Sequence, residues 1–150
     1  MASASIHYSQ CARIEIYLMN LNELLAIPYE SNGRTQQGAD CYGIVRMARV
    51  YLFGKPWMPV YGAVEGSDKR ALTEAMQAEA VNFKECQPIP GAIAAAFRGK
   101  LCTHIAIVVD IDGKRMILET DEPGKGSHGP RLVNLRFFEQ RFLKVVYYDD

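Results

Sequence analysis

Two side chains with the chemistry of a nucleophile and a base lie far apart in this sequence, Cys41 and His104. Cys41 follows Gly38-Ala39-Asp40, where a loop is predicted to turn into a helix, and His104 opens an apolar strand. At a helix N-terminus, unpaired backbone N–H groups and the positive end of the helix dipole would stabilise a thiolate. A histidine beside the thiol would act as its base. The two residues favour a cysteine hydrolase, and the alternative is a buried core cysteine.

A carboxylate would complete such a site, and the sequence offers two, Glu119 and Asp121. Asp112-Gly113 predicts a two-residue hairpin turn, which fixes how the flanking strands pair. In that register His104 lies opposite Asp121, with Glu119 as its diagonal neighbour on the same face. Either carboxylate would fix the imidazole tautomer and favour the imidazolium, which is the orienting role in a catalytic triad. The alternative for both acids is solvation at the end of the hairpin.

The segments that must position these residues change character halfway along the chain. Apolar residues in the first half have helical spacing, and helices are predicted at residues 9–25, 41–53 and 68–83. Residues 30–39 are predicted to be a polar loop, and Gly43 is expected to leave the next helix open to a substrate. Strands are predicted at residues 92–97, 103–110, 115–120, 131–135 and 143–148. Helices followed by a mostly antiparallel sheet predict a single α+β domain over residues 1–150.

The composition argues against several classes of function. The 150 residues include 17 basic and 17 acidic side chains, so the net charge favours neither nucleic acid nor an anionic membrane surface as a partner. No apolar run is long enough to span a membrane. The four cysteines lack C-x-x-C spacing, so we expect free thiols rather than zinc ligands, and we expect no cofactor.

Several motifs follow one another in the order found in the NlpC-type papain-like cell-wall peptidases, which the chain resembles over most of its length. The motifs are Pro28-Tyr29, Gly38, Asp40-Cys41, Gly43-Ile44-Val45-Arg46, Pro90-Gly91, His104-Ile105-Ala106-Ile107 and Leu118-Glu119-Thr120. A further stretch is most similar to the phage-tail branch of this family, whose members help a phage through the cell wall. It contains Gly54, Pro56, Pro59 and Tyr61.

The resemblance implies a papain-like fold, with the nucleophile helix packed on the sheet, and hydrolysis of a peptidoglycan stem-peptide bond. The bond is typically the one between D-glutamate and the diamino acid. By the same resemblance, Cys41 would be the nucleophile, His104 the base and then the acid, and Glu119 the orienting residue. Tyr29 would place its hydroxyl beside the thiol, near the oxyanion site. The implied partners are stem peptides and phage-tail proteins.

Three residues depart from the family's pattern. Tyr42 replaces the small hydroxyl residue that follows the cysteine, Ala92 replaces an acid, and Glu119 replaces a histidine, asparagine or glutamine. The first and last departures favour an alternative function, a tail or injection-machine component whose peptidase site is unused. A related thiol amidase or acyltransferase is a third possibility. We expect no signal peptide, because no basic segment precedes an apolar stretch. The protein would then be virion-associated, or cytoplasmic until it is delivered to the cell wall.

Overall fold

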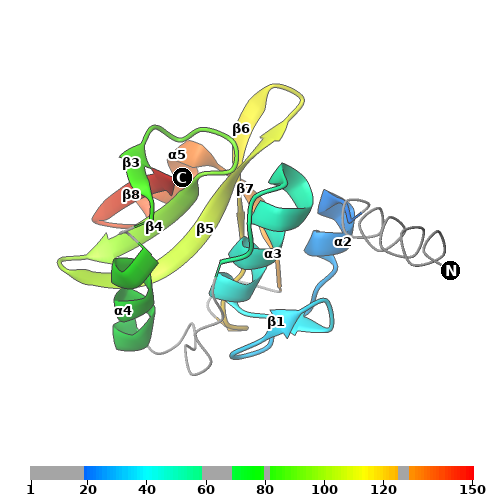
Figure 1. The fold of residues 1–150 in the computed structure, drawn as a ribbon, viewed down its shortest axis with the longest axis horizontal. Helices are drawn as coiled ribbons and strands as arrows, with labels where there is room; N and C mark the ends of the chain where they lie inside the picture. Colours follow the sequence, from blue (N-terminus) through cyan, green and yellow to red (C-terminus); the bar gives the residue numbers. More distant parts are fainter. Residues whose placement is uncertain (1–18, 59–68, 80–81, 125–128) are drawn as a thin grey trace, which may run out of the picture.

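The computed structural model describes residues 19–58, 69–79, 82–124 and 129–150, which form an α+β structure (Figure 1). Its largest element is a six-stranded antiparallel sheet in the order β3-β8-β4-β5-β6-β7. The strands of this sheet are β3 (Lys84–Cys86), β4 (Ile93–Arg98), β5 (Leu101–Ile111), β6 (Lys114–Glu119), β7 (Arg131–Asn134) and β8 (Lys144–Asp149). The helices are α2 (Leu21–Leu25), α3 (Cys41–Phe53), α4 (Lys69–Glu79) and α5 (Leu135–Gln140). The predicted α+β class with a mostly antiparallel sheet is confirmed.

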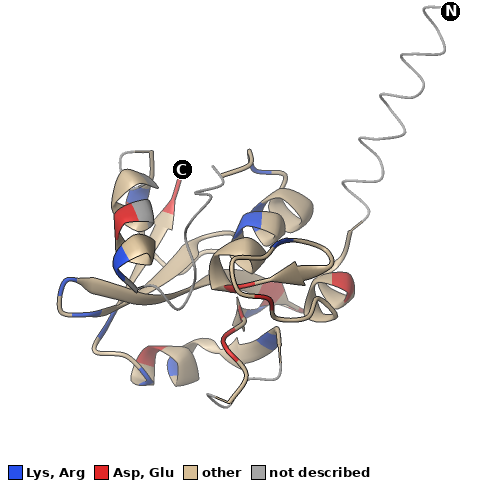
Figure 2. Ribbon diagram, turned by 90° about the horizontal axis from the view of Figure 1, so that it is seen from below, with Lys and Arg blue, Asp and Glu red and all other residues tan. Residues whose placement is uncertain are grey.

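Helices pack on both faces of this sheet, because successive residues of a strand point to opposite sides. On one face, Ile105 of β5 belongs to a buried cluster with Ile44 of α3 and Leu72 of α4. On the other face, Ala106 of β5 is buried with Phe138 of α5. Figure 2 shows acidic and basic residues side by side along α4, where no single sign of charge prevails. Within the described ranges, we find no helix with the length and hydropathy that a membrane crossing requires.

The hairpin between β5 and β6 has the register expected from the sequence. Ile111 pairs with Lys114 across the turn, as predicted. Asp112 and Gly113 have φ angles of 53° and 81°, and a type I′ turn requires positive φ at both of these positions. The pairing therefore carries the candidate base on β5 and the candidate carboxylate on β6 toward the same end of the hairpin.

Helix α3 begins and ends where the sequence predicts. The Asp40 side chain caps it by accepting a hydrogen bond from the N–H of Gly43 at 2.9 Å, and Cys41 is its first residue. Gly54, with φ of 63°, ends the helix in the left-handed conformation that glycine adopts without strain. Cys41 thus lies in the first turn, where backbone N–H groups have no partner within the helix.

The loop predicted at residues 30–39 contains a short hairpin, in which β1 (Arg34–Thr35) pairs with β2 (Gly38–Ala39). This hairpin packs against the start of α3. A Cβ atom at Gly43 would lie 2.2 Å from the carbonyl oxygen of Gly33. The expectation that Gly43 leaves the first turn open to a substrate is therefore wrong, because backbone of the hairpin already fills that space.

Gly43→Ala is expected to destabilise the protein by about 1–3 kcal/mol, because the added methyl group must displace a backbone carbonyl rather than a flexible side chain. Urea denaturation of the two proteins would measure this difference. Alanine has the higher helix propensity, by about 1 kcal/mol. A variant as stable as the wild type, or more stable, would therefore show that propensity prevails and that the contact with Gly33 is not restrictive.

Two further short elements are absent from the sequence-based prediction, β3 and α5. Each has few residues and gains its stability from packing on the sheet, so neither has a periodic pattern of its own. The helix predicted at residues 9–25 does not continue through Asn20. The Asn20 side chain instead caps the short helix α2 by accepting a hydrogen bond from the N–H of Glu23. Residues 9–18, Pro59 and Tyr61 lie outside the described residues.

Candidate active site

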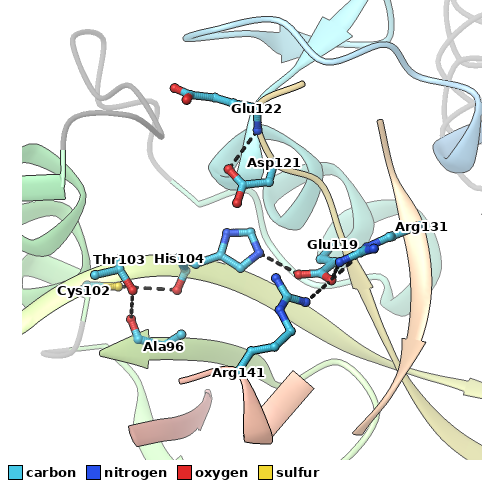
Figure 3. Close-up of polar contacts among 9 residues, drawn as sticks. All are labelled: Ala96, Cys102, Thr103, His104, Glu119, Asp121, Glu122, Arg131 and Arg141. Carbon is cyan, nitrogen blue, oxygen red and sulfur yellow. Dashed lines mark hydrogen bonds and ion pairs between the residues drawn. The ribbon is translucent and has the colours of Figure 1, made fainter. Parts of the chain in front are cut away.

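The fold brings together the three residues expected to carry the chemistry. Cys41 comes from the first turn of α3, His104 from β5 and Glu119 from the end of β6. The imidazole Nε2 of His104 lies 2.9 Å from Oε1 of Glu119 (Figure 3). The Cys41 thiol is close enough to be the neighbour that most strongly favours protonation of the same ring. A thiol, an imidazole and a carboxylate therefore adjoin one another in the order that a catalytic triad requires.

The protonation of His104 is governed by opposing effects. Burial lowers the pKa of the imidazole, but the interactions with Cys41 and Glu119 outweigh it and raise the pKa from 6.5 to about 9. Glu119 accepts a hydrogen bond from the Nε2–H, and Nδ1 is buried with no hydrogen-bond partner among the described residues. Nδ1 is thus the nitrogen left to exchange a proton with the thiol.

Glu119 is a buried carboxylate with three cationic or potentially cationic partners. Its residue is 1% exposed. Its Oε2 accepts hydrogen bonds from Arg141 at 2.5 Å and from Arg131 at 3.1 Å (Figure 3). Burial raises the pKa of Glu119, but the hydrogen bonds and charges of His104 and Arg141 outweigh it and lower the pKa to about 2. The side chain is therefore ionised at neutral pH and accepts the imidazole N–H.

Aromatic side chains of α5 and the turn after it hold the imidazole in place. The rings of Phe138 and Phe142 lie 6.0 and 5.9 Å from that of His104, centroid to centroid. Sequence reasoning missed both phenylalanines, since α5 was not predicted. The spacing Phe138 to Phe142, i to i+4, is the one sequence signal that would have placed them on a common face.

Of the two candidate orienting acids, the structure brings Glu119 and not Asp121 into hydrogen-bonding contact with the imidazole. The carboxylate of Asp121 accepts a hydrogen bond from the backbone N–H of Glu122 at 2.8 Å. Figure 3 shows Asp121 above the His104 ring, with its carboxylate joined by a dashed line to Glu122 and not to the ring. The diagonal neighbour makes the contact because Glu119 is the longer acid and still lies on the strand.

Tyr29 also lies in this region, next to the start of α3. Its backbone forms a parallel bridge with Ala39. Burial raises the pKa of the Tyr29 hydroxyl, and the negative charges of Glu122, Asp40 and Cys41 raise it further. Tyr29 therefore stays protonated at neutral pH and keeps its O–H available as a donor near the thiol.

The residues on either side of Cys41, Asp40 and Tyr42, both contact Arg34. Arg34 contacts Asp40 at 2.6 Å, and its guanidinium group lies over the Tyr42 ring at 5.0 Å. Tyr42 is fully buried. Asp40 is thus paired with an arginine of the β1–β2 hairpin, and a packed ring fills the position where the resembled family has a small hydroxyl residue.

Access to the sulfur is restricted in this structure. Cys41 and His104 are each 2% exposed. A pocket of about 240 Å³ forms between α3 and the end of β8, lined in part by Arg49, Trp57 and Phe83. It lies toward the C-terminal end of α3, and Cys41 is at the other end. The thiol and the imidazole therefore present little surface to solvent.

Cys86 and Cys102 are free thiols, as expected, and Cys102 is buried on β5, the strand that also carries His104. Cys11 lies outside the described residues. No group of three or more histidine, cysteine, aspartate or glutamate side chains that would hold a metal ion is found in the part of the chain that the structure describes.

Comparisons with known proteins add no family name to this geometry. A scan against protein-family models gave no match, and a search of curated proteins gave none either.

Glu119→Gln is expected to lower the pKa of His104 from about 9. The carboxylate stabilises the imidazolium, so its removal disfavours the charged form of the ring. Loss of the imidazolium with rising pH should then begin at a lower pH in the variant. An NMR titration of the ring measures the shift, and Asp121→Asn is the control that should change it less. Equal shifts in both variants would contradict the assignment of Glu119 as the orienting residue.

Proposed function

We propose that the protein is a cysteine peptidase of the papain-like type that hydrolyses a peptidoglycan stem-peptide bond. The observation that carries the proposal is the position of His104, which is hydrogen-bonded to Glu119 and whose pKa is raised by the neighbouring thiol of Cys41. A helix with a cysteine in its first turn, packed on an antiparallel sheet that supplies the histidine and the third residue, supports the papain-like assignment.

The proposed reaction begins with transfer of the thiol proton of Cys41 to Nδ1 of His104. The sulfur attacks the peptide carbonyl, and the oxyanion is stabilised by N–H groups at the start of α3 and by the hydroxyl of Tyr29. The imidazolium then gives its proton to the leaving amine, and the carbon–nitrogen bond breaks. Water, deprotonated by His104, attacks the resulting thioester and releases the acid product together with the free thiol.

The substrate part of the proposal rests on the motif resemblance. Stem peptides, and in particular the bond between D-glutamate and the diamino acid, are what that resemblance implies. Digestion of purified peptidoglycan followed by mass spectrometry of the muropeptides would test it. Fragments that end at the D-glutamate carboxyl and begin at the diamino acid are expected. Intact stem peptides after prolonged digestion would reject the substrate.

One observation favours a second candidate function, a phage-tail or delivery-machine component with an unused site. Cys41 is 2% exposed, and the residue after it, Tyr42, is fully buried with the Arg34 guanidinium over its ring. This alternative predicts a folded protein that binds tail proteins or cell wall without releasing any product. A related thiol amidase or acyltransferase would instead form a lasting acyl-enzyme, which mass spectrometry of the intact protein detects.

A further inference from the structure

The two carboxylate oxygens of Glu119 have different partners. Oε1 faces Nε2 of His104 at 2.9 Å. Oε2 faces Nη1 of Arg141 at 2.5 Å, and both Nε and Nη2 of Arg131 at 3.1 Å. The carboxylate side chain is 2% exposed, so solvent does little to screen these charges. Two guanidinium groups thus bind the oxygen that the imidazole does not use.

The arginines change what the carboxylate does to the imidazole. A buried carboxylate alone would hold the imidazolium proton strongly and make the ring a poor acid. Two positive charges on the far oxygen offset this attraction and also compensate the burial of the carboxylate. The charged and titratable groups around the ring are Cys41 from α3, Glu119 from β6, Arg131 from β7, Arg141 from the end of α5, and Asp121 from the segment after β6.

Aromatic contacts hold Arg141 itself in place. Its guanidinium carbon lies 5.7 and 5.1 Å from the ring centroids of Phe138 and Phe142, which also flank the imidazole. Its backbone N–H donates to the carbonyl of Phe138 at 3.2 Å. The same short helix therefore fixes both the ring of His104 and the arginine that acts on its carboxylate partner.

We propose that Arg141, together with Arg131, is a positioning residue that acts on His104 through Glu119. It keeps Oε1 directed at the imidazole and offsets the charge of the carboxylate, so that the ring can both accept and release a proton. The inference rests on the proposed function and explains how a glutamate can stand where the resembled family has a neutral residue or a histidine. During acylation the proton moves from Sγ through Nδ1 to the leaving amine, and during deacylation it moves from water through Nδ1 to Sγ. Glu119 and both arginines keep their charges throughout.

The test is an NMR titration of the His104 ring in the purified protein without substrate, with the signal assigned from His104→Gln. In Arg141→Met we expect the pKa of the ring to rise by about one unit, because a nearby positive charge is lost while Arg131 still holds the carboxylate. Arg141→Lys and Arg136→Met should stay close to the wild type. Arg136 is an exposed residue of the same helix. An unchanged or lowered pKa in Arg141→Met, or an equal rise in Arg136→Met, would overturn the proposal.

Two further variants separate charge from packing. Arg131→Met removes the other guanidinium, from a side chain that is 36% exposed. The pKa of the His104 ring should rise in this variant too, so it provides the test if Arg141→Met fails to fold. In a Glu119→Gln background, Arg141→Met should raise the pKa less than it does in the wild type, because its action through the carboxylate is gone. An equal rise in both backgrounds contradicts an action through Glu119. The NMR titration uses no substrate, so its result is independent of the muropeptide digest. A negative digest would reject the proposed function and leave the test of Arg141 unaffected.

Discussion

Cys41→Ala is expected to abolish release of new amine groups from peptidoglycan while leaving the protein folded. The sulfur is the atom that forms the covalent intermediate, and alanine offers no nucleophile in its place. The loss should be on the order of 10⁴-fold or more, since nucleophile and base act as a unit. Amine release from purified peptidoglycan, measured with equal amounts of the two proteins, gives the result.

The matched control is Cys86→Ala. Cys86 is also a free thiol, and it lies on β3 at the opposite edge of the sheet from β7. Its removal should leave the rate unchanged, and circular dichroism should show both variants folded. Equal rates for wild type and Cys41→Ala would reject the proposed mechanism. Equal loss in both variants would point to destabilisation rather than chemistry.

His104→Gln is expected to lower activity on the order of 10³-fold or more, because no base takes the thiol proton and no acid protonates the leaving amine. Glutamine keeps an N–H donor for Glu119, so the buried carboxylate retains its partners and the fold is less disturbed than with alanine. The rate of amine release from peptidoglycan is again the measurement.

The double variant Cys41→Ala/His104→Gln makes this test specific. Residues that act in one chemical step are not additive, so the double variant should be no slower than Cys41→Ala alone. A double variant whose loss of rate equals the product of the two single losses would indicate that the two side chains work independently. That outcome would separate His104 from the chemistry of the thiol even if each single variant were inactive.

The main parts of the site are predictable from local sequence. Asp40 caps α3, and Asp112-Gly113 sets the register of the hairpin, because both depend on residues that are neighbours in the chain. These two features place Cys41 in a first helical turn and carry the base and the carboxylate to the same end of the hairpin. The motif resemblance adds Tyr29, which the structure also places beside the start of α3.

The surroundings of the site are not predictable in this way. Register alone placed Asp121 nearer to His104 than Glu119, and the choice between them depends on where the strand ends and how far each side chain reaches. Arg141 contacts Glu119 only because α5 folds over the sheet, and that helix is too short to have a recognisable period. The sequence alone predicts that Gly43 opens the helix, and only the assembled hairpin shows that Gly33 occupies the space.

The rate at which iodoacetamide alkylates Cys41 near neutral pH tests the central claim most directly. A thiol paired with an imidazole at a helix N-terminus should react faster than Cys11, Cys86 and Cys102 in the same sample, even though Cys41 is only 2% exposed. Peptide mass spectrometry at successive times resolves the four rates. Selective early modification of Cys41 is the predicted result, and modification of Cys41 no faster than of the other three would contradict the account.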